Sequence, residues 1–241
     1  MDGKPLWHKD LGAMDSGYYL IPSAQWGFAS SPVIYDGKVV VLCDVQTNSF
    51  LAVFDLLNGT ELCRTPRKDV PTWGTPTVVK TSDRTEILVN GWHHTGAYDF
   101  SSGRVIWHLN GGGDIPVPTP IVGNGLAYFT SGHGPGRPLR AIRIDATGDI
   151  TPPSLGSTNA NIAWAQPHSG TYMQTPIVVG ENLYACLDTG ALTCLDAKSG
   201  KIHYTERMGS GGEGFTSSPV SDGRNLYFAS EVGNVYPSPC S

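Results

Sequence analysis

Apolar residues occur along the chain in short runs that are separated by polar, Gly-containing turns, and this pattern predicts β-strands. The runs at 38–43 and 126–130 directly follow the dipeptides Asp36-Gly37 and Asn124-Gly125. Such dipeptides are strong signals for tight hairpin turns because both residues tolerate a positive φ angle. No stretch combines a 3.6-residue apolar period with helix caps. The sequence therefore predicts an all-β chain.

A longer repeat is superimposed on these runs. Ser or Thr followed by Pro and a short apolar run recurs at Pro32, Pro76, Pro120, Pro176 and Pro219, at spacings of 44, 44, 56 and 43 residues by subtraction. A period of about 40–45 residues is that of one four-stranded propeller blade. The longer third unit contains a stretch at 151–161 rich in Pro, Ser, Asn and Gly, which we interpret as a loop insertion.

Within a unit, the third predicted strand ends on an Asp, and a Gly-containing turn then leads to the fourth strand. The second unit is the most complete example, with Ala97, Asp99, Gly103 and Trp107 in register. Other units keep parts of this motif as Asp55 with Gly59 and as Asp196 with Gly200. The Asp and Gly are suited to closing the turn, and the large ring is suited to packing between neighbouring blades. In the third unit, Trp164 is expected to serve beyond the insertion.

The segment 97–107 resembles the tryptophan-docking motif of PQQ-like (quinoprotein-type) β-propeller repeat proteins, a family that includes an outer-membrane assembly propeller lipoprotein. The resemblance implies four-stranded blades in a WD40-like repeat architecture, with about five blades present in a partial propeller. We expect one array over 1–241. Its units lie near 32–66, 76–109, 120–167, 176–207, and 219–236 together with an N-terminal strand at 6–11.

The two ends of the array leave two arrangements open. Residues 6–11 are predicted to form a lone fourth strand, and Pro237-Ser238-Pro239-Cys240 is predicted to stop the last unit where its third strand should continue. The chain is then either part of a larger propeller, which we favour, or a five-blade ring closed by the N-terminal strand. A partial propeller would expose sheet edges that are prone to association.

Composition narrows the functional classes. Charged residues make up 15% of the chain and the net charge is -5, with no Lys/Arg run, so a nucleic-acid partner is unsupported. No apolar stretch approaches the roughly 18 residues of a membrane span. The five cysteines form no C-x-x-C pair and are expected to be buried free thiols. The chain opens without a signal peptide, and only the resemblance indicates a bacterial periplasmic or other extracytoplasmic location.

Propeller connections alternate between two faces. The short turns occupy one face, and the connections between units share the other face with the loops between second and third strands, which we call the loop face. Its candidate ligand residues are Trp26, Trp73, Trp92, His93, His94, Asp114, His133, Tyr172 and Gln174. A purely structural interpretation is also open, in which Trp26 and Trp73 pack between neighbouring blades. His93 and His94 are adjacent and should point to opposite sides, so no metal site is predicted.

Two functions remain open at this point. The favoured one is a non-catalytic module that binds a protein or another ligand on the loop face, with no cofactor. The alternative is a PQQ- and calcium-dependent dehydrogenase or a piece of one. Calcium needs about six or more oxygen ligands, and the loop face offers only scattered candidates: Asp44, Asn48, Asp114 and Glu213. An enzyme is therefore not the favoured interpretation.

Overall fold

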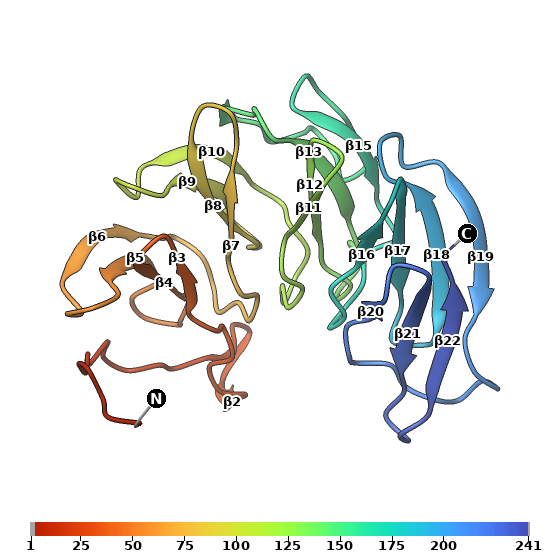
Figure 1. Cartoon of the computed structure of the whole chain (residues 1–241), viewed down its shortest axis with the longest axis horizontal. Helices are drawn as coiled ribbons and strands as arrows, with labels where there is room; N and C mark the ends of the chain where they lie inside the picture. The colour runs from red at the N-terminus through yellow and green to blue at the C-terminus, as the bar shows by residue number, and fades with distance from the viewer. Residues whose placement is uncertain (1–2, 241) are drawn as a thin grey trace.

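The computed structural model describes residues 3–240, in which five blade sheets are set side by side in an arc and a separate two-stranded sheet precedes them (Figure 1). Blade 1 contains β3 (Val33–Tyr35), β4 (Lys38–Cys43), β5 (Phe50–Asp55) and β6 (Glu61–Pro66). Blade 2 contains β7 (Thr77–Lys80), β8 (Thr85–Val89), β9 (Thr95–Asp99) and β10 (Val105–Leu109). Blade 3 contains β11 (Ile121–Gly123), β12 (Leu126–Thr130), β13 (Leu139–Arg143) and β15 (Ile162–Gln166).

Blade 4 contains β16 (Ile177–Val179), β17 (Asn182–Cys186), β18 (Ala191–Asp196) and β19 (Ile202–Arg207). Blade 5 contains β20 (Val220–Ser221), β21 (Asn225–Ala229) and β22 (Val235–Pro239). The first strand of each blade lies on the inner side of the arc, and blades 1 and 5 lie at its two ends (Figure 1). No helix occurs within residues 3–240, which confirms the all-β prediction, and the blades of this range form an open arc, as expected for a partial propeller.

The core lies between the blades. Strands such as β8 and β12 are buried on both faces because each sheet packs against a neighbour on either side. Between blades 1 and 2, Leu42 and Val53 contact Ile87 and Tyr98 within one apolar cluster. Equivalent clusters join blades 2 and 3, blades 3 and 4, and blades 4 and 5. The continuous apolar runs of the second and third strands are the sequence counterpart of this two-sided burial.

The Asp and Gly of the repeat motif close the turn between third and fourth strands, as expected. The Asp99 carboxylate accepts hydrogen bonds from the Ser101 and Ser102 amides, and Gly103 has a φ of 72°. Asp55 and Asp196 accept equivalent bonds in blades 1 and 4. A Cβ on Gly200 would lie 2.5 Å from the Trp164 ring. The absence of a side chain there lets the indole of blade 3 settle on the turn of blade 4.

The N-terminal segment departs from the prediction. Residues 6–11 form no strand and lie on blade 1 rather than completing blade 5. Trp7 is placed as Trp164 is: a Cβ on Gly59 would lie 2.6 Å from its ring, and Nε1 donates to the Leu56 carbonyl at 2.8 Å. The segment covers an apolar face of blade 1 that a preceding blade would otherwise cover, so the five-blade ring closed by this strand is wrong.

The expectation that residues 237–240 end the pattern is also wrong, because β22 continues to Pro239. The Ser230 amide donates to the Asn234 carbonyl, and the Cys240 amide donates to the Arg224 carbonyl. Together with the register of the two strands, these bonds establish which residues of β22 direct their backbone groups toward β21. Pro237 and Pro239 therefore sit at positions whose nitrogens face away from β21. Since β22 is an edge strand of its sheet, the missing N–H groups cost no ladder bond.

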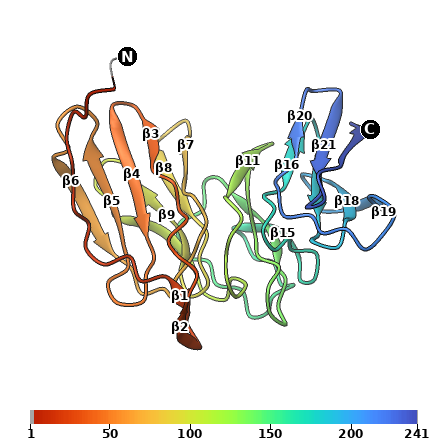
Figure 2. The same cartoon turned by 90° about the horizontal axis from the view of Figure 1, so that it is seen from below.

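Two short elements lie outside the regular blades. In the long third unit, β14 (Gly148–Asp149) adds to blade 2 by pairing in parallel with β10, so that Trp107 faces Gly148. Ahead of blade 1, β1 (Gly17–Tyr18) and β2 (Ile21–Gln25) form a hairpin, which projects at the bottom of Figure 2. All five cysteines are free thiols, and Cys43, Cys186 and Cys194 are buried.

Candidate functional site

The β1–β2 hairpin brings two tyrosines to the tryptophans of the loop face. Tyr18 stacks on Trp26 with ring centroids 5.4 Å apart and planes 15° apart, and Trp26 lies 5.5 Å from Trp73. Tyr19 reaches blade 2, where its ring lies 4.4 Å from Trp92. The hairpin thus links aromatic side chains from the segments before blades 1 and 2 and from the β8–β9 loop. We call the whole group the aromatic surface.

His133 extends the aromatic surface across blade 3 toward blade 4. Its ring lies 6.3 Å from Tyr18 and 5.3 Å from Tyr172, and its Nδ1 is 3.2 Å from the Asp114 carboxylate. Asp114 also acts on Tyr19: burial raises the pKa of Tyr19 to about 12, and the nearby carboxylate adds to the shift. Asp114 is therefore a carboxylate held among aromatic rings from three separate segments.

The backbone beside this carboxylate is strained. Ile115, which follows Asp114, has a φ of 52°, a left-handed conformation that is rare for a β-branched residue. The Ile115 side chain is 3% exposed and lines a pocket next to the aromatic surface. Strain of this kind, of order 1–3 kcal/mol, persists only where the surrounding packing determines the conformation, and it is found most often at functional sites.

The pocket is open and apolar, with a volume of about 380 Å³. It is lined by Trp26, Ala29, Trp73, Ile115, Val117, Tyr172 and Met173. Trp26 is 53% exposed and Met173 is 39% exposed, so large apolar surfaces face solvent at its rim. Trp73 is held in place because its Nε1 donates to the Gly27 carbonyl at 2.9 Å. Trp73 is thus anchored to the segment before blade 1 and also lines the pocket, and its role in binding a ligand stays a prediction.

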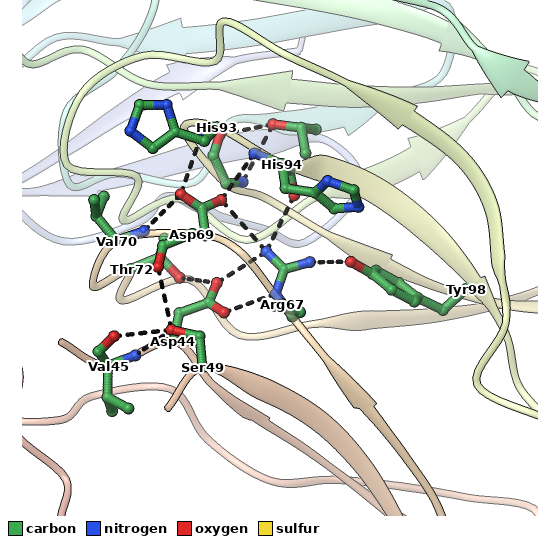
Figure 3. Close-up of polar contacts among 12 residues, drawn as sticks. Asp44, Val45, Ser49, Arg67, Asp69, Val70, Thr72, His93, His94 and Tyr98 are labelled. Atoms are coloured by element: carbon green, nitrogen blue, oxygen red, sulfur yellow. Dashed lines mark hydrogen bonds and ion pairs between the residues drawn. The ribbon is translucent and has the colours of Figure 1, made fainter. Parts of the chain in front are cut away.

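The structure separates His93 from His94. Asp69 accepts hydrogen bonds from both backbone amides at 3.0 Å, which fixes the β8–β9 loop (Figure 3). The His93 ring stacks on Trp92, whereas the His94 ring stacks on His108. Burial and the nearby Arg67 guanidinium lower the pKa of His94 to about 4. Within residues 3–240, no group of three or more His, Cys, Asp or Glu side chains is placed to hold one metal ion.

A buried ion-pair network lies beneath this loop (Figure 3). Arg67 donates from Nε to Asp44 at 2.7 Å and from Nη2 to the same carboxylate at 3.0 Å, and both side chains are fully buried. Nη1 donates to the Tyr98 hydroxyl, and Thr72 donates to Asp44 at 2.9 Å. The network ties the loops of blades 1 and 2 together, which places the segment that carries Trp73.

Gln174 does not belong to the exposed site. It is 1% exposed, and its side chain donates to the Phe215 carbonyl and accepts from the Met173 amide, so it joins the segments before blades 4 and 5. Conversely, sequence reasoning missed Tyr18, Tyr19 and Met173. The Tyr19-Leu20 turn lacks the Gly or Asn that signals a hairpin. Only the adjacent aromatic pair, in an otherwise irregular N-terminal segment, marks this position in the sequence.

Radial four-stranded sheets with Asp–Gly turns and docked indoles define a β-propeller of the PQQ-like type. A family model described as outer membrane protein assembly factor BamB matches residues 1–237, and the chain belongs to this family. A comparison with curated protein sequences found no match.

Solved structures with the same fold are distant in sequence. BamB from Moraxella catarrhalis has a TM-score of 0.60 and 15% identity over 90% of this chain. Quinohemoprotein alcohol dehydrogenase from Comamonas testosteroni has a TM-score of 0.65 and 13% identity over 94% of this chain. The C-terminal WD40 domain of Sif2 has a TM-score of 0.61 and 10% identity over 86%. The chain spans 62%, 42% and 55% of these three structures, respectively.

Within residues 3–240, no helix has the length and apolar character needed to cross a bilayer.

Proposed function

We propose that the chain is a non-catalytic propeller module that binds a protein partner through the aromatic surface and its pocket. The observation that carries this proposal is the open apolar pocket with Trp26, Trp73, Tyr172 and Met173 at its wall. Exposed tryptophan and tyrosine beside a pocket are the residue types that dominate binding energy at protein interfaces. Met adds a flexible apolar side chain that adapts to the shape of a partner.

The family description supports a protein partner and an extracytoplasmic location, because it names an outer membrane protein assembly factor. The interface would be formed by loops carried on rigid blades, which is how repeat propellers present recognition surfaces. The Arg67–Asp44 network and the stacked hairpin keep the aromatic side chains in place before binding. Such pre-organisation lowers the entropic cost of association.

The likeness to quinohemoprotein alcohol dehydrogenase, and to a europium-containing methanol dehydrogenase with a TM-score of 0.53, raises a quinone-dependent activity as the second candidate. The stacked rings of the aromatic surface suit a planar ligand. The residues do not fit a bound calcium or lanthanide ion, because the pocket lining contributes no carboxylate or amide side chain and only one phenol oxygen, that of Tyr172. Calcium takes about six to eight oxygen ligands. A PQQ- and calcium-dependent reaction is therefore the less supported proposal.

A photo-crosslinking amino acid at Met173 tests the partner proposal in envelope fractions. We expect a specific adduct with one protein that disappears when Trp73→Ala is combined with the crosslinker. The control carries the crosslinker at Leu57, which is 74% exposed on the opposite face. Adducts of equal yield from both positions would contradict the proposal. Calcium-dependent, saturable quenching of the six tryptophans by PQQ would instead favour the dehydrogenase.

A further inference from the structure

A second buried arginine, unlike Arg67, has no acidic partner among residues 3–240. Arg140 lies on β13 and is 4% exposed, between blades 2 and 3. Its Nη1 donates to the Gly111 carbonyl at 2.9 Å, and its Nε is buried and has no hydrogen-bond partner in the part of the chain that the structure describes. Arg67 by contrast pairs with Asp44 and contacts Asp69. The two residues show that this fold buries a guanidinium with compensating charge at one blade interface and without it at the next.

The charge of Arg140 persists in this position. Burial lowers the pKa of Arg140 to about 10, with no carboxylate contributing, so the side chain remains protonated at neutral pH. Water can satisfy its hydrogen bonds but cannot neutralise its charge, and a buried ion without a counterion is strongly disfavoured. The site therefore favours a negatively charged occupant.

A small cavity of about 10 Å³ lies against this side chain. It is lined by Arg140, Asn90, Thr95, Leu109, Gly112, Gly113, Phe129, Thr130, Pro138 and Ile142. The centre of a water-sized particle can move through about 10 Å³ here, so one small ion or water fits, whereas phosphate, carboxylate ligands and aromatic rings do not. The Thr130 side chain lies on the opposite face of blade 3, where its Oγ1 accepts from the Thr171 amide, so the guanidinium is the donor left for an occupant.

The cavity wall cannot expand readily. Gly113 packs so tightly against blade 3 that a Cβ there would lie 2.4 Å from the Ser131 Cβ. The Asn90 amide donates to the Pro118 and Thr130 carbonyls at 2.9 and 2.8 Å, which fixes the opposite side. From the unpaired guanidinium and the size of the cavity, we propose that Arg140 forms a buried binding site for a single monatomic anion, chloride in solution.

Thermal unfolding of the whole chain tests this site. We compare sodium chloride with sodium gluconate at equal ionic strength, because gluconate is too large for the cavity. Saturating chloride should raise Tm by about 5 °C, since a ligand that binds only the folded state stabilises it by mass action. Arg140→Met should abolish the difference between the two salts. Arg143→Met, an exposed position on the same strand, should retain it.

Crystallography of the wild-type protein tests the site without requiring that a variant fold. Wild-type crystals grown in sodium bromide should show an anomalous peak within about 3.5 Å of Arg140 Nε, the usual range of an N–H donor to a halide. A peak there together with a chloride-specific Tm increase supports the site. The absence of a peak, with density for water in the cavity, overturns it, as does an equal Tm in the two salts.

Discussion

Trp7 donates a hydrogen bond from its indole Nε1 to the carbonyl oxygen of Leu56 at 2.8 Å, although 49 residues separate them. Trp164 makes the same bond to Ala197, also at 2.8 Å. The contact at the start of the chain thus repeats the contact between blades 3 and 4, with an irregular segment in place of a fourth strand. Docking of an indole on the Asp–Gly turn does not require that the indole come from a complete blade.

The Trp7 contact should be measurable in stability. Trp7→Ala removes the ring from the face of blade 1 and leaves the Leu56 carbonyl to water. Since Trp7 is only half-buried, we expect a loss of about 2 kcal/mol in the free energy of unfolding. Leu6→Ala, at a neighbour that is 77% exposed, should change it by less than about 0.5 kcal/mol. Urea unfolding of the two variants provides the comparison, and equal losses would contradict the docking role.

Gly200 and Gly180 have similar backbone conformations, so substitutions at these two positions distinguish the cost of steric packing from the cost of backbone strain. Gly200 and Gly180 have φ angles of 70° and 61°, but only a Cβ at Gly200 would meet the Trp164 ring, while nothing lies within 4 Å of Gly180. Gly180→Ala should cost about 1 kcal/mol from the backbone alone. Gly200→Ala should cost about 3 kcal/mol because the ring must move. Similar losses in thermal or urea unfolding would show that the indole contact is dispensable.

The buried network beneath the β8–β9 loop predicts a strong and non-additive response. Arg67→Met leaves Asp44 buried without its guanidinium, and Asp44→Asn leaves Arg67 without its main counterion. Each change should destabilise the fold by about 3–5 kcal/mol. The double variant should be less destabilised than the sum, since Asp44 and Arg67 are then both replaced by neutral groups and Asp69 keeps its bonds from the His93 and His94 amides. A double-mutant cycle in urea measures this coupling, and strict additivity would contradict it.

The lowered pKa of His94 predicts that the folded state loses stability in weak acid. Its folded-state pKa of about 4 lies below the ordinary value of 6.5, so between these pH values the unfolded chain binds more protons than the folded chain. The contribution of neutral His94 is complete above pH 6.5 and is lost as pH falls toward 4. His94→Gln should reduce the slope of unfolding free energy against pH in this window. An unaltered slope in this variant would refute the assignment.

The edge strand β22 predicts a change in association. Pro237 and Pro239 remove two of the N–H groups that would otherwise face outward from blade 5. Replacing both with Val restores these donors and the β-propensity of the edge, so self-association should increase. Ser238→Val is the control, because the Ser238 amide faces β21. Sedimentation velocity compares the variants, and an unchanged monomer fraction in the double variant would show that the prolines do not protect this edge.

The sequence by itself determined the repeat, the all-β class and the turns, because these follow from local chemistry. The Asp55–Gly59 and Asp196–Gly200 turns close through bonds between residues only two or three positions apart. The strand pattern identified β4 and β12 to the residue for the same reason. The docking of Trp164 beyond the insertion was also expected from the sequence, and its indole bonds the Ala197 carbonyl.

Only the tertiary structure decided which distant segments meet. Tyr18 reaches Trp26 and His133, and Arg67 meets Asp44, through contacts that no periodicity encodes. The position of residues 6–11 on blade 1 depends on which apolar face is left uncovered, and this is a property of the assembled array. In the sequence, nothing distinguishes Arg140 from the other residues of its strand. Its buried charge exists only because blades 2 and 3 close around it.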